Sequence, residues 1–180
     1  MKKLTARFIL FVLTLGLLVV AFGSMFLPYL SADSEAYYTG FRIVFGYSES
    51  YEMLGSTITT TYLEFSILAF LEYVFICLPA VIMVLSIINK KFSTLKFKLA
   101  NIVMLVIAGV LALNTKSIVA PGSAYPAIEA LDKTRLDTLL ASYPDLGYGA
   151  IVFAVAVFTA VVFIVLSILL NDSKKKKRKK

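Results

Sequence analysis

Two ionisable residues lie inside long apolar stretches of the sequence, and they are the first candidates for chemistry. Glu72 lies within FSILAFLEYVFICLPAVIMVLSII, and Lys116 lies near the end of LANIVMLVIAGVLALNTKSIV. A charged side chain in a membrane span costs about 3 kcal/mol on insertion scales, so each of these residues needs a partner or water. The pattern leaves two interpretations open. Glu72 and Lys116 form a structural ion pair, or they form a polar vestibule, with Asn114 and Glu64, that binds an ion or a small polar substrate.

The spacing of basic residues places Glu72 and Lys116 at one level. Glu72 precedes Lys90 by 18 residues, and Lys116 follows Lys98 by 18 residues. At a helical rise of 1.5 Å per residue, both side chains lie about 27 Å from the boundary that these lysines mark. The two helices are joined by a short loop, so we expect them to be neighbours.

Catalytic and metal-binding patterns are missing from the sequence. The chain has no histidine, which is the commonest general base and a common metal ligand. Its single cysteine, Cys77, can form neither an intrachain disulfide nor a cysteine-based metal site. It also contains no glycine-rich phosphate loop, no GxSxG sequence and no HExxH sequence. We therefore expect no enzymatic activity, no metal and no cofactor.

The composition predicts a membrane protein. Hydrophobic residues make up 59% of the 180 residues, charged residues make up 16%, and the mean hydropathy is +0.87. A helix needs roughly 20 apolar residues to cross the hydrocarbon core of a bilayer. Four segments meet this requirement and predict an all-α membrane protein with four transmembrane helices, at residues 8–30, 65–88, 99–119 and 149–170. Together they form one four-pass transmembrane domain over residues 1–173, followed by a basic tail at residues 174–180.

The distribution of lysine and arginine predicts the orientation of these helices. Fourteen of the 18 basic residues lie in the N-terminus, in the connection between the second and third segments, or in the tail. Basic residues near helix ends stay on the cytoplasmic side. The protein is therefore expected in a plasma membrane with both termini on the cytoplasmic side. The outer loops are then residues 31–64 and 120–148.

The tail consists of seven consecutive basic residues: Lys174, Lys175, Lys176, Lys177, Arg178, Lys179 and Lys180. Directly after a membrane helix, such a run faces the anionic inner leaflet of the lipid bilayer, where each charge contributes about 1 kcal/mol. A docking role toward an acidic partner is the alternative. No aromatic residue interrupts the run, so the stacking contacts that favour nucleic-acid binding are not supported.

The outer loops contain patterns of secondary structure that predict a small extracellular cap. Two segments are predicted as strands: GFRIVFG, with Phe41, Ile43 and Phe45 on one face, and the β-branched STITTTYL. The intervening YSESYEMLGS carries turn formers and acids, so the pattern predicts a β-hairpin or a small sheet. In the second loop an approximately helical stripe predicts a surface helix between Pro126 and Pro144. Its residues are Ile128, Leu131, Leu136 and Leu139.

Two further features concern contacts between the membrane helices. Asn101, near the cytoplasmic end of the third segment, is expected to form an interhelical hydrogen bond. Small residues at i and i+4 permit close approach of helix backbones. They are Ala108/Ala112, Ala150/Ala154 and Ala156/Ala160.

The stretch FLPYLSADSEAYYTGFRIVFG resembles a segment of small uncharacterised four-helix membrane proteins of Gram-positive bacteria. In those proteins the first helix runs into LP plus an aromatic residue and then into a GF-x-x-x-FG stretch. The resemblance covers about 30 residues and implies no activity. The layout of the loops is also similar to that of claudin-type proteins. This chain lacks the tryptophan and the paired loop cysteines of claudins, so no claudin function is carried over.

These observations predict a non-enzymatic accessory or scaffold protein that contacts a membrane protein partner, or further copies of itself, through its outer cap, helix faces or tail. The alternative is a small oligomeric channel or transporter that uses the level of Glu72 and Lys116.

Overall fold

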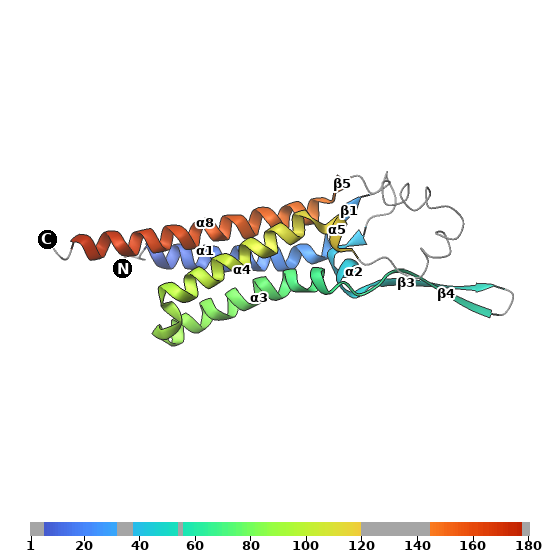
Figure 1. Cartoon of the computed structure of the whole chain (residues 1–180), viewed down its shortest axis with the longest axis horizontal. Coiled ribbons are helices and arrows are strands. Elements are labelled where there is room, and N and C mark those ends of the chain that lie inside the picture. Colours follow the sequence, from blue (N-terminus) through green and yellow to red (C-terminus); the bar gives the residue numbers. More distant parts are fainter. Residues whose placement is uncertain (1–5, 32–37, 54–55, 120–144, 178–180) are drawn as a thin grey trace. The chain divides into compact units, whose positions relative to one another are not determined.

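The computed structural model describes residues 6–31, 38–53, 56–119 and 145–177 (Figure 1). These residues contain four helices that are long and apolar enough to cross a membrane, which indicates a multi-pass membrane protein. They are α1 (Ala6–Gly23), α3 (Ile67–Ile88), α4 (Leu95–Leu113) and α8 (Tyr148–Lys177). The prediction of four apolar helices is confirmed.

The chain divides into two compact units. The first unit comprises Met1–Gly23, Glu72–Val110 and Val152–Lys180, and it holds most of the four long helices. The second unit comprises Ser24–Leu71 and Leu111–Ile151, and it holds all of the described strands.

Aromatic and small side chains form the core of the first unit. The Tyr73 ring, on α3, meets Phe22 of α1 at 6.2 Å and Phe153 of α8 at 5.7 Å between ring centroids, both edge to face. All six alanines at the predicted i, i+4 spacing are buried, and four of them, Ala108, Ala154, Ala156 and Ala160, belong to this unit. Small residues therefore lie on the packed faces of α4 and α8, as the spacing predicts.

The first helix is shorter than predicted. α1 ends at Gly23, a single 3₁₀ turn follows at Ser24–Phe26, and residues Pro28–Ser31 form strand β1 rather than helix. Proline disfavours helical geometry in the residue before it and has no N–H to donate, so the helix stops ahead of Pro28. β1 is the middle strand of an antiparallel sheet between β2 (Tyr38–Thr39) and β5 (Asp145–Leu146).

The prediction of a strand at GFRIVFG is wrong, because Gly40–Phe45 forms helix α2. The Thr39 hydroxyl caps this helix by accepting a hydrogen bond from the Arg42 N–H at 3.3 Å. One helical turn also brings the Phe41 and Phe45 rings to 4.7 Å. Gly46 ends the helix with φ +88°, a conformation that glycine adopts readily. Local capping and an i, i+4 aromatic contact thus outweigh the alternating pattern.

The structure contains the predicted β-hairpin, but its first strand is a different segment from the one predicted. β4 (Ser56–Leu63) is the predicted STITTTYL strand, but it pairs with β3 (Tyr47–Met53), a segment that the sequence pattern predicts as a turn. Hydroxyl pairs join the two strands, Ser48 with Thr61 at 3.1 Å and Ser50 with Thr59 at 3.0 Å. Cross-strand pairs of this kind stabilise a sheet, and they explain how a polar segment becomes a strand.

The third and fourth helices differ from prediction at their ends. α4 begins at Leu95 and ends at Leu113, and after Asn114 a separate turn, α5, covers Thr115–Ile118. A 3₁₀ turn, η2 (Lys90–Ser93), precedes α4. α8 continues past Leu170 to Lys177, so the first four lysines of the tail are helical. The helix predicted between Pro126 and Pro144 lies outside the described residues.

Candidate functional site

The four residues predicted to form a polar membrane site divide between the two units. Glu72 belongs to the first unit, whereas Glu64, Asn114 and Lys116 belong to the second. Glu72 is 1% exposed, and the other three side chains are exposed. An ion pair between Glu72 and Lys116 would join the two units and stays a prediction.

Glu72 is nevertheless unusual by itself. It lies on the buried face of α3 with Ile76 and Met83, at helical spacing. Within the described part of the chain, its Oε1 atom has no hydrogen-bond partner. A buried polar group left in this state costs about 1–3 kcal/mol. Packing alone therefore does not explain why α3 carries a carboxyl group at this position.

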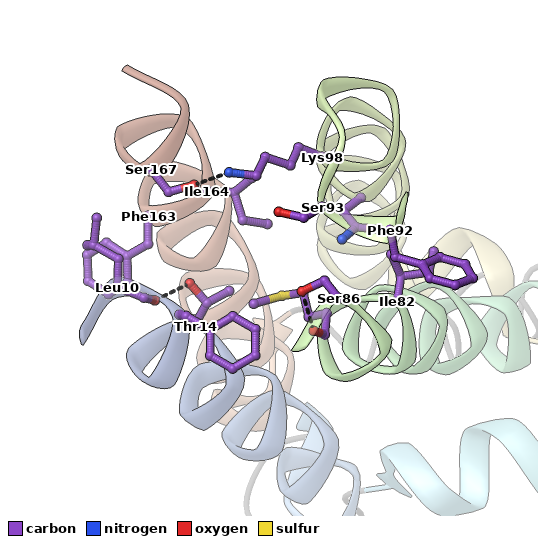
Figure 2. A pocket seen from close by; sticks show the side chains of 13 residues that line it. Leu10, Thr14, Ile82, Ser86, Phe92, Ser93, Lys98, Phe163, Ile164 and Ser167 are labelled. Carbon is purple, nitrogen blue, oxygen red and sulfur yellow. Dashed lines mark hydrogen bonds between the residues drawn. The ribbon is translucent and has the colours of Figure 1, made fainter. Parts of the chain in front are cut away.

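A pocket that sequence reasoning missed lies within the first unit and has a volume of about 320 Å³ (Figure 2). It is lined by residues of α1, α3, η2, α4 and α8. Its polar side chains are Thr14, Ser86, Ser93, Lys98, Asn101 and Ser167. Apolar side chains, among them Leu10, Ile82 and Phe163, complete the wall. The lining therefore combines hydrogen-bonding groups with a hydrocarbon surface.

Among the described residues, one cation lines this pocket. The Lys98 ammonium reaches from α4 to α8 and donates a hydrogen bond to the Ser167 hydroxyl at 3.2 Å (Figure 2). The bond fixes the charge at the pocket wall. An ammonium has three N–H donors, so the bond to Ser167 and a contact with a bound anion are compatible.

Two hydroxyl groups of the pocket donate their protons within their own helices. Thr14 donates to the Leu10 carbonyl at 2.7 Å, and Ser86 donates to the Met83 carbonyl at 2.6 Å (Figure 2). A hydroxyl group that donates in this way presents its oxygen as an acceptor to anything else that approaches. Both side chains therefore act toward the pocket as acceptors.

Asn101 adds a third acceptor. Its side chain is 3% exposed, and among the described residues its Oδ1 atom has no hydrogen-bond partner. This oxygen does not form the predicted interhelical hydrogen bond there. Because Asn101 is a residue of the pocket lining, a ligand in the pocket could supply the missing donor.

The pocket lies at the end of the helices where the basic residues gather. Leu10 comes from the start of α1, and Ser167 comes from the last part of the apolar stretch of α8. Ser93 belongs to η2, beside the exposed side chains of Lys91 and Lys96. A positive potential is therefore expected around the pocket.

The sequence carries only a faint signal of this site. Lys98 and Asn101 are three residues apart, which places both on one face of α4. Thr14, Ser86 and Ser167 are isolated hydroxyl groups within apolar runs, and each alone is commonplace in a membrane helix. Only the packing of several elements brings these residues to one place.

A second hollow in the first unit is purely apolar, with a volume also of about 320 Å³. It lies between α1 and α3, and its lining includes Leu18, Phe22, Ile76 and the exposed Cys77. It offers a lipid chain a surface but no polar group to select one ligand over another.

In the second unit, the base of the hairpin carries a cluster of interacting side chains. The Tyr47 hydroxyl donates a hydrogen bond to Glu49 Oε1, and the Arg42 guanidinium lies 4.1 Å from the centroid of the Tyr47 ring. Tyr62 stacks on Tyr47 at 5.8 Å between centroids. The hydrogen bond to Glu49 is the main reason why the pKa of Tyr47 lies above that of a free tyrosine.

The tail predicted to bind lipid or a partner is described only as far as Lys177, as part of α8. Arg178, Lys179 and Lys180 lie outside the described residues. In the part of the chain that the structure describes, no group of three or more His, Cys, Asp or Glu residues could hold a metal ion. No protein-family model, curated protein or solved structure matches the chain.

Proposed function

We propose that the chain is a non-enzymatic accessory or scaffold protein of a bacterial plasma membrane, with both termini in the cytoplasm and the β3–β4 hairpin outside. The bias of lysine and arginine toward the termini and the α3–α4 connection supports this orientation. The resemblance of the first outer loop to a segment of small Gram-positive membrane proteins supports the bacterial setting.

The β3–β4 hairpin is the observation that carries the scaffold role. In the described residues β3 and β4 pair only with one another, so each strand has one edge without a strand partner. A lone two-stranded hairpin is marginally stable in water. A chain that keeps seven paired positions in such a hairpin gains stability if another strand joins its edge.

The composition of the hairpin specifies the partner. Residues 47–63 contain two acids, Glu49 and Glu52, and no basic residue. The side chains of Glu52, Thr57 and Thr59 are exposed. The surface therefore suits an extended, basic segment of a partner membrane protein that adds to one edge through main-chain hydrogen bonds. The basic tail supplies a second contact, with the anionic inner leaflet or with an acidic region of the same partner.

The test is site-specific photocrosslinking in the native membrane. A crosslinker at Thr59, on the hairpin, should capture one stoichiometric partner, whereas a crosslinker at the exposed Val103 of α4 should capture lipid or nothing. Glu52→Lys should weaken capture, and Glu64→Lys, an equal charge change at an exposed site outside the hairpin, should not. Equal capture from Thr59 and Val103 would contradict hairpin docking. Deleting residues 174–180 then measures the contribution of the tail.

A transport role is the second candidate, and Glu72 favours it. Its carboxyl group is almost fully buried in a span, and one of its oxygens has no partner among the described residues, which is typical of an ion or proton path. If the protein is a channel or transporter, Glu72→Gln should abolish ion flux in liposomes without loss of folding. If Glu72 forms a structural pair, Glu72→Lys should destabilise the fold and Lys116→Glu should restore it.

A further inference from the structure

The polar groups of the pocket in the first unit include both hydrogen-bond acceptors and donors. Thr14 and Ser86 have already donated their protons, and the Asn101 oxygen has no partner among the described residues. The same lining also holds donors: the Lys98 ammonium, the Ser93 and Ser167 hydroxyls and the amide N–H groups of Asn101. The lining therefore suits a ligand that has an anionic group to contact Lys98 and several hydroxyls, because a hydroxyl can both donate and accept a hydrogen bond.

The position of the pocket restricts the ligand further. The pocket lies at the basic end of membrane helices, where the headgroups of the adjacent leaflet are found. Its volume of about 320 Å³ is at the lower limit of small-molecule sites, which suits a headgroup rather than a whole lipid. Leu10, Ile82 and Phe163 offer an apolar wall to the first carbons of an acyl chain.

We propose that this pocket binds the headgroup of an anionic phospholipid whose phosphate carries a polyol, as in phosphatidylglycerol. The phosphate lies against Lys98, and the headgroup hydroxyls donate to Asn101 Oδ1 and to the Ser86 hydroxyl oxygen. The site is separate from the hairpin and does not depend on hairpin docking.

The first experiment compares ligands on the purified full-length chain in a neutral detergent. Thermal stability is measured with phosphatidylglycerol, with phosphatidic acid, which has the phosphate without the polyol, and with phosphatidylcholine. We expect phosphatidylglycerol to bind about tenfold more tightly than phosphatidic acid, and phosphatidylcholine to bind weakest. Soluble glycerol phosphate at the same concentration should give no shift. A shift equal to that of the lipid would overturn the assignment to a membrane lipid in favour of a soluble phosphate.

The second experiment tests the residues. Lys98→Gln should lower the affinity for phosphatidylglycerol about tenfold, because it removes a charge-assisted hydrogen bond. Lys96→Gln is the matched control: it removes an equal charge from an exposed side chain that does not line the pocket, and it should leave the affinity unchanged. An equal loss in both variants would show general attraction to a basic surface and would overturn the proposal.

Substitutions of the acceptor residues Asn101 and Ser86 test whether their oxygens bind the lipid headgroup. Asn101→Leu should remove most of the preference for phosphatidylglycerol over phosphatidic acid, and its melting temperature without lipid should stay the same or rise. Ser86→Ala provides a second, smaller change that should reduce the same preference severalfold. If both variants keep the preference for the polyol headgroup, the hydroxyl contacts are absent and the proposal fails.

Discussion

Replacing Gly147 with alanine tests a close backbone approach in the second unit. Gly147 follows β5, and its N–H donates to the Tyr29 carbonyl of β1 at 2.8 Å. A Cβ atom at this position would lie 2.7 Å from the Pro28 carbonyl carbon and 2.8 Å from that of Tyr29, and in contact with the Pro28 oxygen. These are main-chain atoms, so no rotation of a side chain can relieve the clash.

The cost follows from the contacts that must move. Overpacking of this kind costs about 1–3 kcal/mol, and loss of the hydrogen bond to Tyr29 costs about 1 kcal/mol. A chain of this length loses about 2–4 °C in melting temperature per kcal/mol, so Gly147→Ala should melt about 5–15 °C lower. The chain contains no tryptophan, so near-ultraviolet circular dichroism of the buried tyrosines, which include Tyr29, is the suitable probe.

Gly16→Ala is the matched control. Gly16 lies within α1, and a Cβ atom added there would meet no atom within 4 Å outside its own stretch of helix. Alanine is favoured over glycine in a helix by about 1 kcal/mol, so this variant should melt at the same temperature or higher. If Gly147→Ala also melted no lower than the unmodified chain, the close approach of residue 147 to β1 would be refuted.

Three further changes test other parts of the structure. The hydrogen bond to Glu49 favours the neutral form of the Tyr47 phenol and is the largest cause of its raised pKa, so the stabilisation is complete below about pH 10 and is lost as the pH rises through the folded-state pKa. Glu49→Leu should lower the pKa of Tyr47 in a spectrophotometric titration. Gly109→Ala places a Cβ atom 2.7 Å from the tip of the Phe158 ring. Because this ring can turn, the substitution should cost about 1 kcal/mol of folding stability. Phe158→Leu should reduce that cost in a double-mutant cycle of thermal unfolding. Glu72→Leu should stabilise the chain by about 1–3 kcal/mol if the carboxyl group is unpaired, whereas destabilisation would demonstrate a partner.

The spans can be predicted from the sequence because each depends on its own apolar content. The apolar pattern predicts a helix over residues 65–88, and α3 covers Ile67–Ile88. The helix ends are less predictable, because they depend on neighbours. Leu30 is apolar and extends the first hydrophobic run, yet it pairs with Leu146, which lies far along the chain. A pattern confined to one segment carries no information about such a partner.

The hairpin shows how two local signals can compete. Phe41, Ile43 and Phe45 alternate as in a strand, but the Thr39 cap and Gly46 define a helix of six residues. Because this segment is helical, Tyr47–Met53 is the stretch that pairs with β4. The β4 strand is correctly predicted, since three consecutive threonines favour extended backbone wherever the partner strand lies.

Glu72 and Asn101 are buried in the same helical unit, and each has an oxygen with no partner among the described residues. Each such oxygen costs about 1–3 kcal/mol, a large share of the stability of a typical domain, so neither is explained by packing. Asn101 lines a pocket that also holds a cation and several hydroxyl groups, so the proposed ligand would account for it. Glu72 does not line that pocket, so the same ligand does not account for it, and the ion pair with Lys116 and the transported ion stay the two proposals for it. The two residues are therefore tested by different experiments. Lipid binding tests the role of Asn101, whereas ion flux and the exchange of charges between residues 72 and 116 test the role of Glu72.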